Sequence, residues 1–119
     1  MTLEEIVRKS GSELGWQEQW HSFGSACYHS PSGLVSFGNG QCIVLIWLLK
    51  VKRDGYNWTG GIGFGAGDSP EAIIEQALKE RCDLRAMAEL SVALSVLKKW
   101  MNHENENQSG QTRSPAALA

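Results

Sequence analysis

Residues 41–53 read Gln-Cys-Ile-Val-Leu-Ile-Trp-Leu-Leu-Lys-Val-Lys-Arg and contain the most apolar stretch of the chain. Polar and apolar residues do not alternate in this run before Lys50, which is typical of a strand covered on both faces. Asp54-Gly55 follows the run and is a strong signal for a two-residue hairpin turn. We therefore expect a central strand that turns at this hairpin and returns antiparallel from Tyr56.

Glycine occupies nearly every second position of the returning strand. One set of alternate positions holds Gly61, Gly63, Gly65 and Gly67, and the other holds Trp58, Gly60, Ile62, Phe64 and Ala66. Successive side chains of a strand point to opposite faces, so one face is apolar and the other is bare backbone. We expect another part of the molecule to lie very close to the bare face.

Before the central strand, the sequence predicts a short helix and a further strand. Thr2 and Glu5 form a capping box for a helix that ends at residues 10–12, Ser-Gly-Ser. Residues 14–23 fit a short helix and an aromatic-rich loop equally well. Residues 34–40 predict a strand that ends in a tight Gly-Asn-Gly turn, in which glycine supplies left-handed backbone angles.

After the returning strand, the sequence predicts a long helix. Asp68 or Ser69 caps it, Pro70 occupies its first turn, and few residues break it before about residue 103, apart from a joint at Cys82-Asp83. The expected fold is α+β, with the order α-β-β-β-α and a three-stranded antiparallel sheet packed by the long C-terminal helix. Residues 1–103 form this single domain, and residues 104–119 are expected to be a disordered polar tail.

The long helix is apolar around an unusually wide arc, roughly 200° of its circumference, which is about twice what one sheet face requires. The spacing of its largest apolar residues is that of a helix-packing seam, formed by Met87, Leu90, Leu94, Leu97 and Met101. We expect one side of the helix to pack on the sheet and the other on a second copy of the chain. Alternatively, the segment with Trp16, Trp20 and Phe23 folds back and covers that side.

The hairpin tip combines cationic and aromatic residues. We expect Arg53, Tyr56 and Trp58 to contact a protein partner. Alternatively, Lys50, Lys52, Arg53 and Asn57 form a basic patch beside which nucleic acid bases would stack on Tyr56 and Trp58. Charges at a hairpin tip more often protect a sheet edge.

Cysteine and histidine give no standard chemical motif. The cysteines, Cys27, Cys42 and Cys82, contain no CxxC pair, which disfavours disulfides and zinc. The cluster with potential metal or nucleophile chemistry is His21, Cys27, His29 and Cys42, in which Cys27 and His29 would share a face of a strand. We expect a buried structural cysteine and a surface histidine, no metal site and no enzyme.

Composition excludes several further classes. The chain has 119 residues, a net charge of −2, and no apolar run of the roughly 20 residues that cross a bilayer. Its mild acidity disfavours a protein whose main task is to neutralise phosphates. Gly61, Gly63 and Ala66 fit a dinucleotide fingerprint, but no second strand follows the helix, so no cofactor is expected. We expect a cytoplasmic protein without a signal peptide.

The junction at residues 65–78, with Gly65, Gly67 and Ser69 before a helix, resembles that of the double-stranded RNA-binding domain. The resemblance implies the α-β-β-β-α order over about residues 2–100 and phosphate binding by lysines at the helix start. Those lysine positions hold Pro70, Glu71 and Ile74 here, and an acidic helix start repels phosphate. Nucleic-acid binding is therefore the alternative function.

We expect a small non-enzymatic protein that binds another protein, as a homodimer. In size, acidity and lack of motifs the chain resembles the accessory or inhibitor proteins of phages and other mobile elements, including anti-CRISPR proteins.

Overall fold

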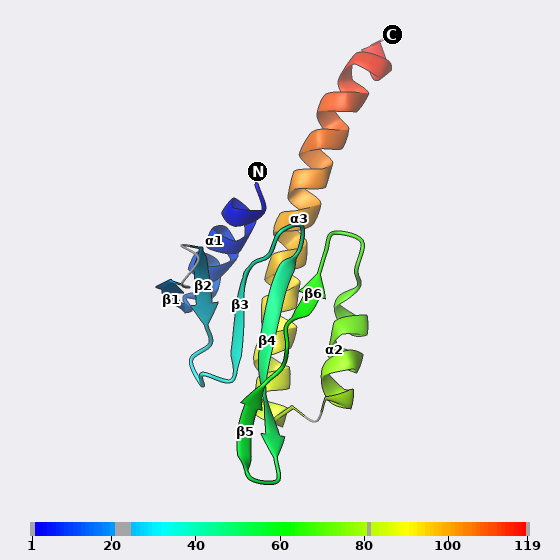
Figure 1. Ribbon diagram of the computed structural model, residues 1–119. Coiled ribbons are helices and arrows are strands. Elements are labelled where there is room, and N and C mark those ends of the chain that lie inside the picture. The colour runs from blue at the N-terminus through cyan, green and yellow to red at the C-terminus, as the bar shows by residue number, and fades with distance from the viewer. Residues whose placement is uncertain (1, 21–24, 81, 119) are drawn as a thin grey trace.

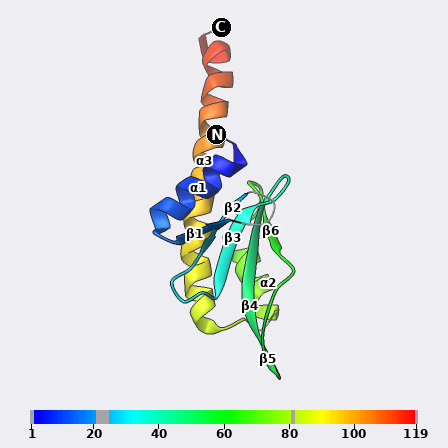
Figure 2. The same ribbon diagram turned by 60° about the vertical axis from the view of Figure 1, so that its left-hand side comes forward.

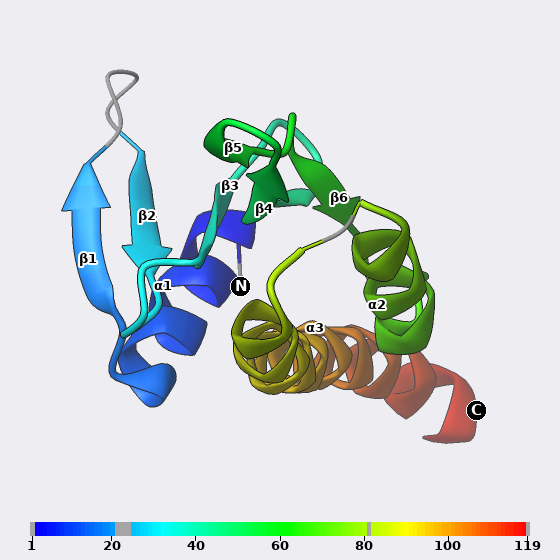
Figure 3. The ribbon, with the colours of Figure 1, turned by 90° about the horizontal axis from the view of Figure 1, so that it is seen from below.

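The computed structural model describes residues 2–20, 25–80 and 82–118, which form an α+β fold. Six strands make one antiparallel sheet in the order β1-β2-β3-β4-β5, and β6 also pairs with β4. The helices α1, α2 and α3 all lie on the same side of this sheet, with α3 between the other two (Figure 3). The result is a two-layer structure with one helix-covered face, called the inner face, and one face without helices, called the outer face.

The elements follow one another along the chain with short connections (Figure 1). Their bounds are α1 Leu3–Leu14, β1 Gln17–Trp20, β2 Ala26–His29, β3 Val35–Asn39, β4 Val44–Lys52, β5 Gly55–Trp58, β6 Ile62–Phe64, α2 Pro70–Lys79 and α3 Leu84–Leu118. No helix in the described part of the chain is both long and apolar enough for a membrane span.

The central strand and its hairpin are confirmed. β4 pairs with β3 along one edge and with β6 and β5 along the other. The turn residues are Arg53 and Asp54, one position before the predicted Asp54-Gly55 pair. Lys52 pairs with Gly55, the first residue of β5, and Gly55 has a φ of 136°, a backbone angle that favours glycine. The apolar run therefore lies in the middle of the sheet, as its sequence predicts.

The expected single returning strand is divided into β5 and β6. Residues 59–61 separate them, and Gly61 has a φ of 91°, which breaks the extended conformation. β5 pairs with the C-terminal end of β4, from Leu49 to Lys52. β6 pairs with the N-terminal part of β4, at Val44, Leu45 and Ile46. Glycine at position 61 allows the chain to change direction between the two pairings.

The sheet has more strands than the predicted three, because the chain forms an additional hairpin before β3. β1 and β2 pair antiparallel, and β2 joins this hairpin to β3. The segment 14–23 is thus neither a short helix nor a loop over residues 17–20, and Phe23 lies outside the described residues. The Gly-Asn-Gly turn was also misplaced: Gly38 and Asn39 belong to β3, and the turn uses residues 40–43.

Helix α1 has the predicted capping box, but it does not end at Gly11. The Thr2 hydroxyl accepts a hydrogen bond from the Glu5 backbone N–H, and the helix continues to Leu14 before Gly15 caps it with a φ of 70°. Gly11 is buried because the ring of Tyr28 from β2 packs on it: a Cβ at position 11 would lie 2.3 Å from ring carbons of Tyr28. The glycine serves close packing of α1 on the sheet.

The predicted joint at Cys82-Asp83 is a complete break between α2 and α3. Ser69 caps α2, and α2 ends at Lys79. Cys82 then forms an isolated β-bridge with Lys50 of β4, and the Lys50 ammonium lies 3.0 Å from the Glu80 carboxylate. These contacts fasten the connection to the sheet, so α2 and α3 pack beside each other.

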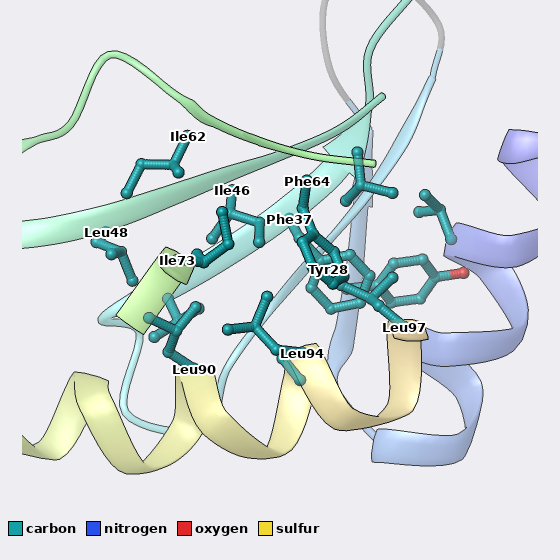
Figure 4. Packing of buried hydrophobic residues seen from close by; sticks show 14 of the residues in the cluster. Tyr28, Phe37, Ile46, Leu48, Ile62, Phe64, Ile73, Leu90, Leu94 and Leu97 are labelled. Atoms are coloured by element: carbon teal, nitrogen blue, oxygen red, sulfur yellow. The ribbon is translucent and has the colours of Figure 1, made fainter. Parts of the chain in front are cut away.

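The predicted seam of α3 lies in the core of its own chain. Leu90, Leu94 and Leu97 have no exposed surface, and Met101 is 3% exposed. Figure 4 shows the three leucines directed toward side chains of the sheet, such as Ile46 and Phe64. The seam is therefore not a surface on which a second chain can pack while this fold is intact.

Much of the wide apolar arc of α3 is covered by α1 and α2, although Val92 stays 54% exposed. α1 packs on one flank of α3 and α2 on the other (Figures 2 and 3). On the α1 side, Trp100 lies between the ammonium groups of Lys9 and Lys99, 5.1 and 5.3 Å from its ring centroid. An N-terminal segment therefore covers this flank, but the segment is α1 and not the one with Trp16, Trp20 and Phe23. Trp16 packs on Phe37 of β3 instead.

Helix α3 extends to Leu118, and its C-terminal turns project beyond the sheet (Figures 1 and 2). The predicted domain boundary at residue 103 stays a prediction.

Substitution of Gly11 tests the packing of α1 on β2. In an exposed helix, Gly→Ala stabilises by about 1 kcal/mol, but the methyl group of Gly11→Ala would overlap the Tyr28 ring. We expect the free energy of unfolding to fall by about 1–3 kcal/mol in urea denaturation. The control is Gly67→Ala, where the added Cβ has no neighbour within 4 Å, with an expected change within about 0.5 kcal/mol. Equal effects of both substitutions would contradict this packing.

Candidate binding pocket

The outer face of the sheet carries two rows of side chains that the strand register sets side by side. The first row runs from Gln17 through His29 and Ser36 to Trp47. The second row is Gln19, Cys27, Gly38, Leu45 and Gly63. Paired residues on neighbouring strands share a face and interact directly. The two rows therefore bring together residues that lie far apart in the sequence.

Close packing over the glycines of the returning segment is confirmed. A Cβ at Gly63 would lie 2.3 Å from Cδ1 of Ile43, so this side chain covers the bare backbone. A Cβ at Gly61 would lie 3.3 Å from Nε1 of Trp47. Large side chains from β4 and from the turn before it thus lie over these glycines. These side chains determine the shape of the outer face.

A pocket of about 380 Å³ lies in this face and is lined by His29, Ser36, Trp47, Trp58 and Thr59. The first row explains its position, because the small Ser36 lies between two much larger side chains, His29 on β2 and Trp47 on β4. Trp58, at the end of β5, forms a further wall. Its ring centroid is 6.5 Å from that of His29, with an edge-on interplanar angle of 84°.

Thr59 holds the Trp58 wall against the sheet. Its hydroxyl accepts a hydrogen bond of 3.0 Å from the Leu48 backbone N–H, and its own N–H donates to the Leu48 carbonyl at 2.9 Å. Thr59 is 6% exposed, so both hydrogen bonds are shielded from water. Trp58 itself is 40% exposed and therefore remains accessible from solution.

The outer face is free of formal charge at its strand positions. In the described strands, the positions that share the outward face with His29, Ser36 and Trp47 hold no aspartate, glutamate, lysine or arginine. Two charged side chains of the sheet form ion pairs away from this face: Glu18 pairs with Arg8 of α1 at 3.2 Å, and Lys50 pairs with Glu80. The pocket is thus surrounded by neutral polar and apolar groups.

Of the three residues predicted to contact a partner, only Trp58 lines the pocket. Tyr56 is 59% exposed on β5, and Arg53 is exposed in the β4–β5 turn, at the tip of the same hairpin. Ser36 and Trp47 carry no local sequence signal of a site, and the pattern around His29 suggested only metal or nucleophile chemistry. The alternation within β4 places Trp47 opposite to the core, but only the register shows that Ser36 and His29 lie beside it.

Cys27 and His29 share the outer face, as expected for a strand, with 3.6 Å between Sγ and Nε2. Cys27 is 2% exposed, and burial raises the pKa of its thiol, an effect that a hydrogen bond with Ser36 partly offsets. Cys42 is exposed in the turn before β4, and His21 lies outside the described residues. Over the described ranges, no three His, Cys, Asp or Glu side chains are arranged to hold a metal ion.

The junction that resembles a double-stranded RNA-binding domain has its polar groups engaged within the chain. The Asp68 carboxylate accepts a hydrogen bond from the Gly65 N–H at 2.7 Å, and the Lys98 ammonium donates to the carbonyls of Ala66 and Asp68. Lys98 and Lys99 both line a hollow beside the start of α2, but Lys98 binds backbone and Lys99 pairs with Glu13 of α1. The first turn of α2 carries the exposed Glu71.

Comparison of the chain with protein-family models, with curated proteins and with solved structures finds no match in any of the three.

Alkylation of the cysteines tests the closed outer-face packing around Cys27. The thiolate is the reactive form, and a raised pKa leaves less thiolate at a given pH. We expect iodoacetamide to modify the exposed Cys42 at least about tenfold faster than Cys27 at pH 8. The Cys27 rate is expected to keep rising at a pH where a free cysteine has levelled off. Peptide mass spectrometry measures both rates, and comparable rates would contradict the buried position of Cys27.

Proposed function

We propose that this protein is a non-enzymatic protein-binding module and that it binds through the outer face of the sheet. The observation that carries the proposal is an uncharged face with a pocket between two tryptophans and exposed apolar side chains beside it. Ile43 is 38% exposed and Trp58 is 40% exposed, and both belong to this face. Exposed apolar surface around an aromatic pocket is typical of protein interfaces, in which tryptophan and tyrosine are enriched.

The charge distribution favours a protein partner over a nucleic acid. Phosphate binding needs several lysine or arginine side chains directed at the ligand. The outward strand positions supply none, Lys50 is paired with Glu80, and Lys98 donates to backbone carbonyls. An inhibitor or accessory role, if the protein has one, would use the same face.

Homodimer formation stays a prediction, but its proposed surface changes. Leu90, Leu94 and Leu97 are fully buried within the chain, so a dimer would have to form through exposed residues. Much of the surplus of apolar residues on α3, which motivated the dimer, is covered by α1 and α2, and Val92 stays exposed.

Affinity capture with outer-face variants tests this function. The full chain and the variants Trp58→Ala and Ile43→Ser serve as baits in an extract of the native host, with and without nuclease. Val92→Ser is the matched control, because Val92 is an apolar side chain on α3 with 54% exposure. We expect a protein whose recovery survives nuclease and Val92→Ser but falls at least about tenfold with either outer-face variant.

Two results of the capture would contradict the proposal. Recovery that is lost on nuclease treatment would support nucleic-acid binding instead. Recovery that is reduced by Val92→Ser but not by Trp58→Ala would place the interface on the helices. Circular dichroism of each bait confirms that the substituted, partly exposed side chains leave the fold intact.

A further inference from the structure

We infer that the pocket lined by Trp47, Trp58 and His29 receives a neutral aromatic side chain of the partner protein. This inference rests on the proposed function and names the group that anchors the partner. Interfaces derive most of their affinity from a few aromatic or arginine side chains that fill well-packed pockets. The size, the walls and the surroundings of this pocket each narrow the choice of anchor.

The pocket is large enough for an aromatic side chain. An apolar cavity of about 150 Å³ holds a benzene molecule, and pockets for drug-sized ligands begin at about 300 Å³. At about 380 Å³, the pocket has room for one phenol or indole group, with its attached backbone entering from the outer face.

The walls of the pocket favour a flat neutral ring. Three of the five described lining side chains are themselves rings, and Trp58 and His29 already adopt the edge-on arrangement that aromatic pairs prefer. The other two, Ser36 and Thr59, are small and nearly buried, and their hydroxyl groups already hydrogen-bond within the chain. The exposed walls are therefore aromatic and favour a flat ring, such as that of tyrosine or tryptophan.

The described lining residues give no counter-charge to an ionic anchor. Among them there is no carboxylate for a lysine, arginine or quaternary ammonium group, and no lysine or arginine for a phosphate or carboxylate. Tryptophan rings attract cations, but no carboxylate among these residues adds to that attraction. The neutral ring is therefore the occupant to which the pocket is best suited.

The surroundings of the pocket favour a protein over a free small molecule. Ile43, above Gly63 on the outer face, and Tyr56, farther along β5, are exposed apolar side chains. A small molecule in the pocket would leave these residues in water, whereas a protein that inserts one ring also covers the neighbouring face.

Nuclear magnetic resonance with amino-acid probes tests the anchor without knowledge of the partner. The full chain, labelled with ¹⁵N, is titrated separately with N-acetyl-tryptophanamide, N-acetyl-leucinamide and tetramethylammonium chloride. We expect saturable shifts with N-acetyl-tryptophanamide at roughly millimolar concentration, confined to His29, Ser36, Thr59 and the indole N–H groups of Trp47 and Trp58. The other two probes are expected to bind at least about fivefold more weakly.

Two variants show whether the pocket binds the probe. Trp58→Ala removes a wall and is expected to weaken N-acetyl-tryptophanamide at least about tenfold. Tyr56→Ala removes an exposed ring from the same strand but outside the pocket lining, and it is expected to change binding less than about twofold. The amide spectrum of each variant reports directly whether it is folded.

Several outcomes would overturn the inference. The first three are the absence of saturable shifts, shifts outside the pocket, and equal or tighter binding of either control probe. The fourth is a set of pocket shifts that depend on protein concentration alone, which would indicate that a second copy of the chain occupies the pocket. Failure here with a successful capture experiment would reject only the aromatic anchor. Binding of N-acetyl-tryptophanamide without any captured protein would instead reject the protein-binding function and leave a pocket for a free aromatic compound.

Discussion

The burial of α3 on three sides is the interaction on which the rest of the structure depends. Leu90, Leu94 and Leu97 direct their side chains to the sheet and have no exposed surface, while α1 and α2 pack on the two flanks of the helix. Burying an aliphatic side chain of this size stabilises a protein by about 1.5–3 kcal/mol. All three helices are thereby drawn to one face of the sheet, and the opposite face is left without a helical cover.

The composition of the outer face is one basis of the proposal that it contacts a protein partner. In a sheet with one solvated face, the strand positions on that face normally carry charged or polar side chains. Here the outward positions of β4 and β5 hold leucine, tryptophan and tyrosine, while Lys50 and Glu18 form ion pairs with residues of the connection after α2 and of α1. The same segregation of charge creates the neutral surroundings of the pocket.

The sequence was informative where a signal is local. The apolar run of β4, the hairpin that follows it, the capping box of α1 and the break near Cys82 all follow from neighbouring residues, although the turn is at Arg53-Asp54, one residue earlier than predicted. β1 was missed because its Gln-Glu-Gln-Trp sequence has little strand propensity, and its pairing with β2 defines it. The apolar arc of α3 was also predicted, but periodicity shows only that an arc is covered and not by which segment.

The candidate site was predictable only in part. Trp58 was identified from its place on the hairpin, but the pocket depends on the small size of Ser36 between His29 and Trp47. These three residues lie on separate strands, and their alignment follows from two register relations between strands. A shift of either register by one residue would turn the side chains to the other face, so no local pattern in the sequence could have located the hollow.

Solvent paramagnetic relaxation measured on the full chain tests most directly which face of the sheet the helices cover. With a neutral soluble gadolinium complex, the account predicts strong relaxation of the Ile43 methyl groups and of the Trp58 ring, and almost none of the methyl groups of Leu90, Leu94 and Leu97. Protection of Ile43 and Trp58 in dilute solution together with strong relaxation of the three leucines would contradict it, because the helices would then cover the opposite face.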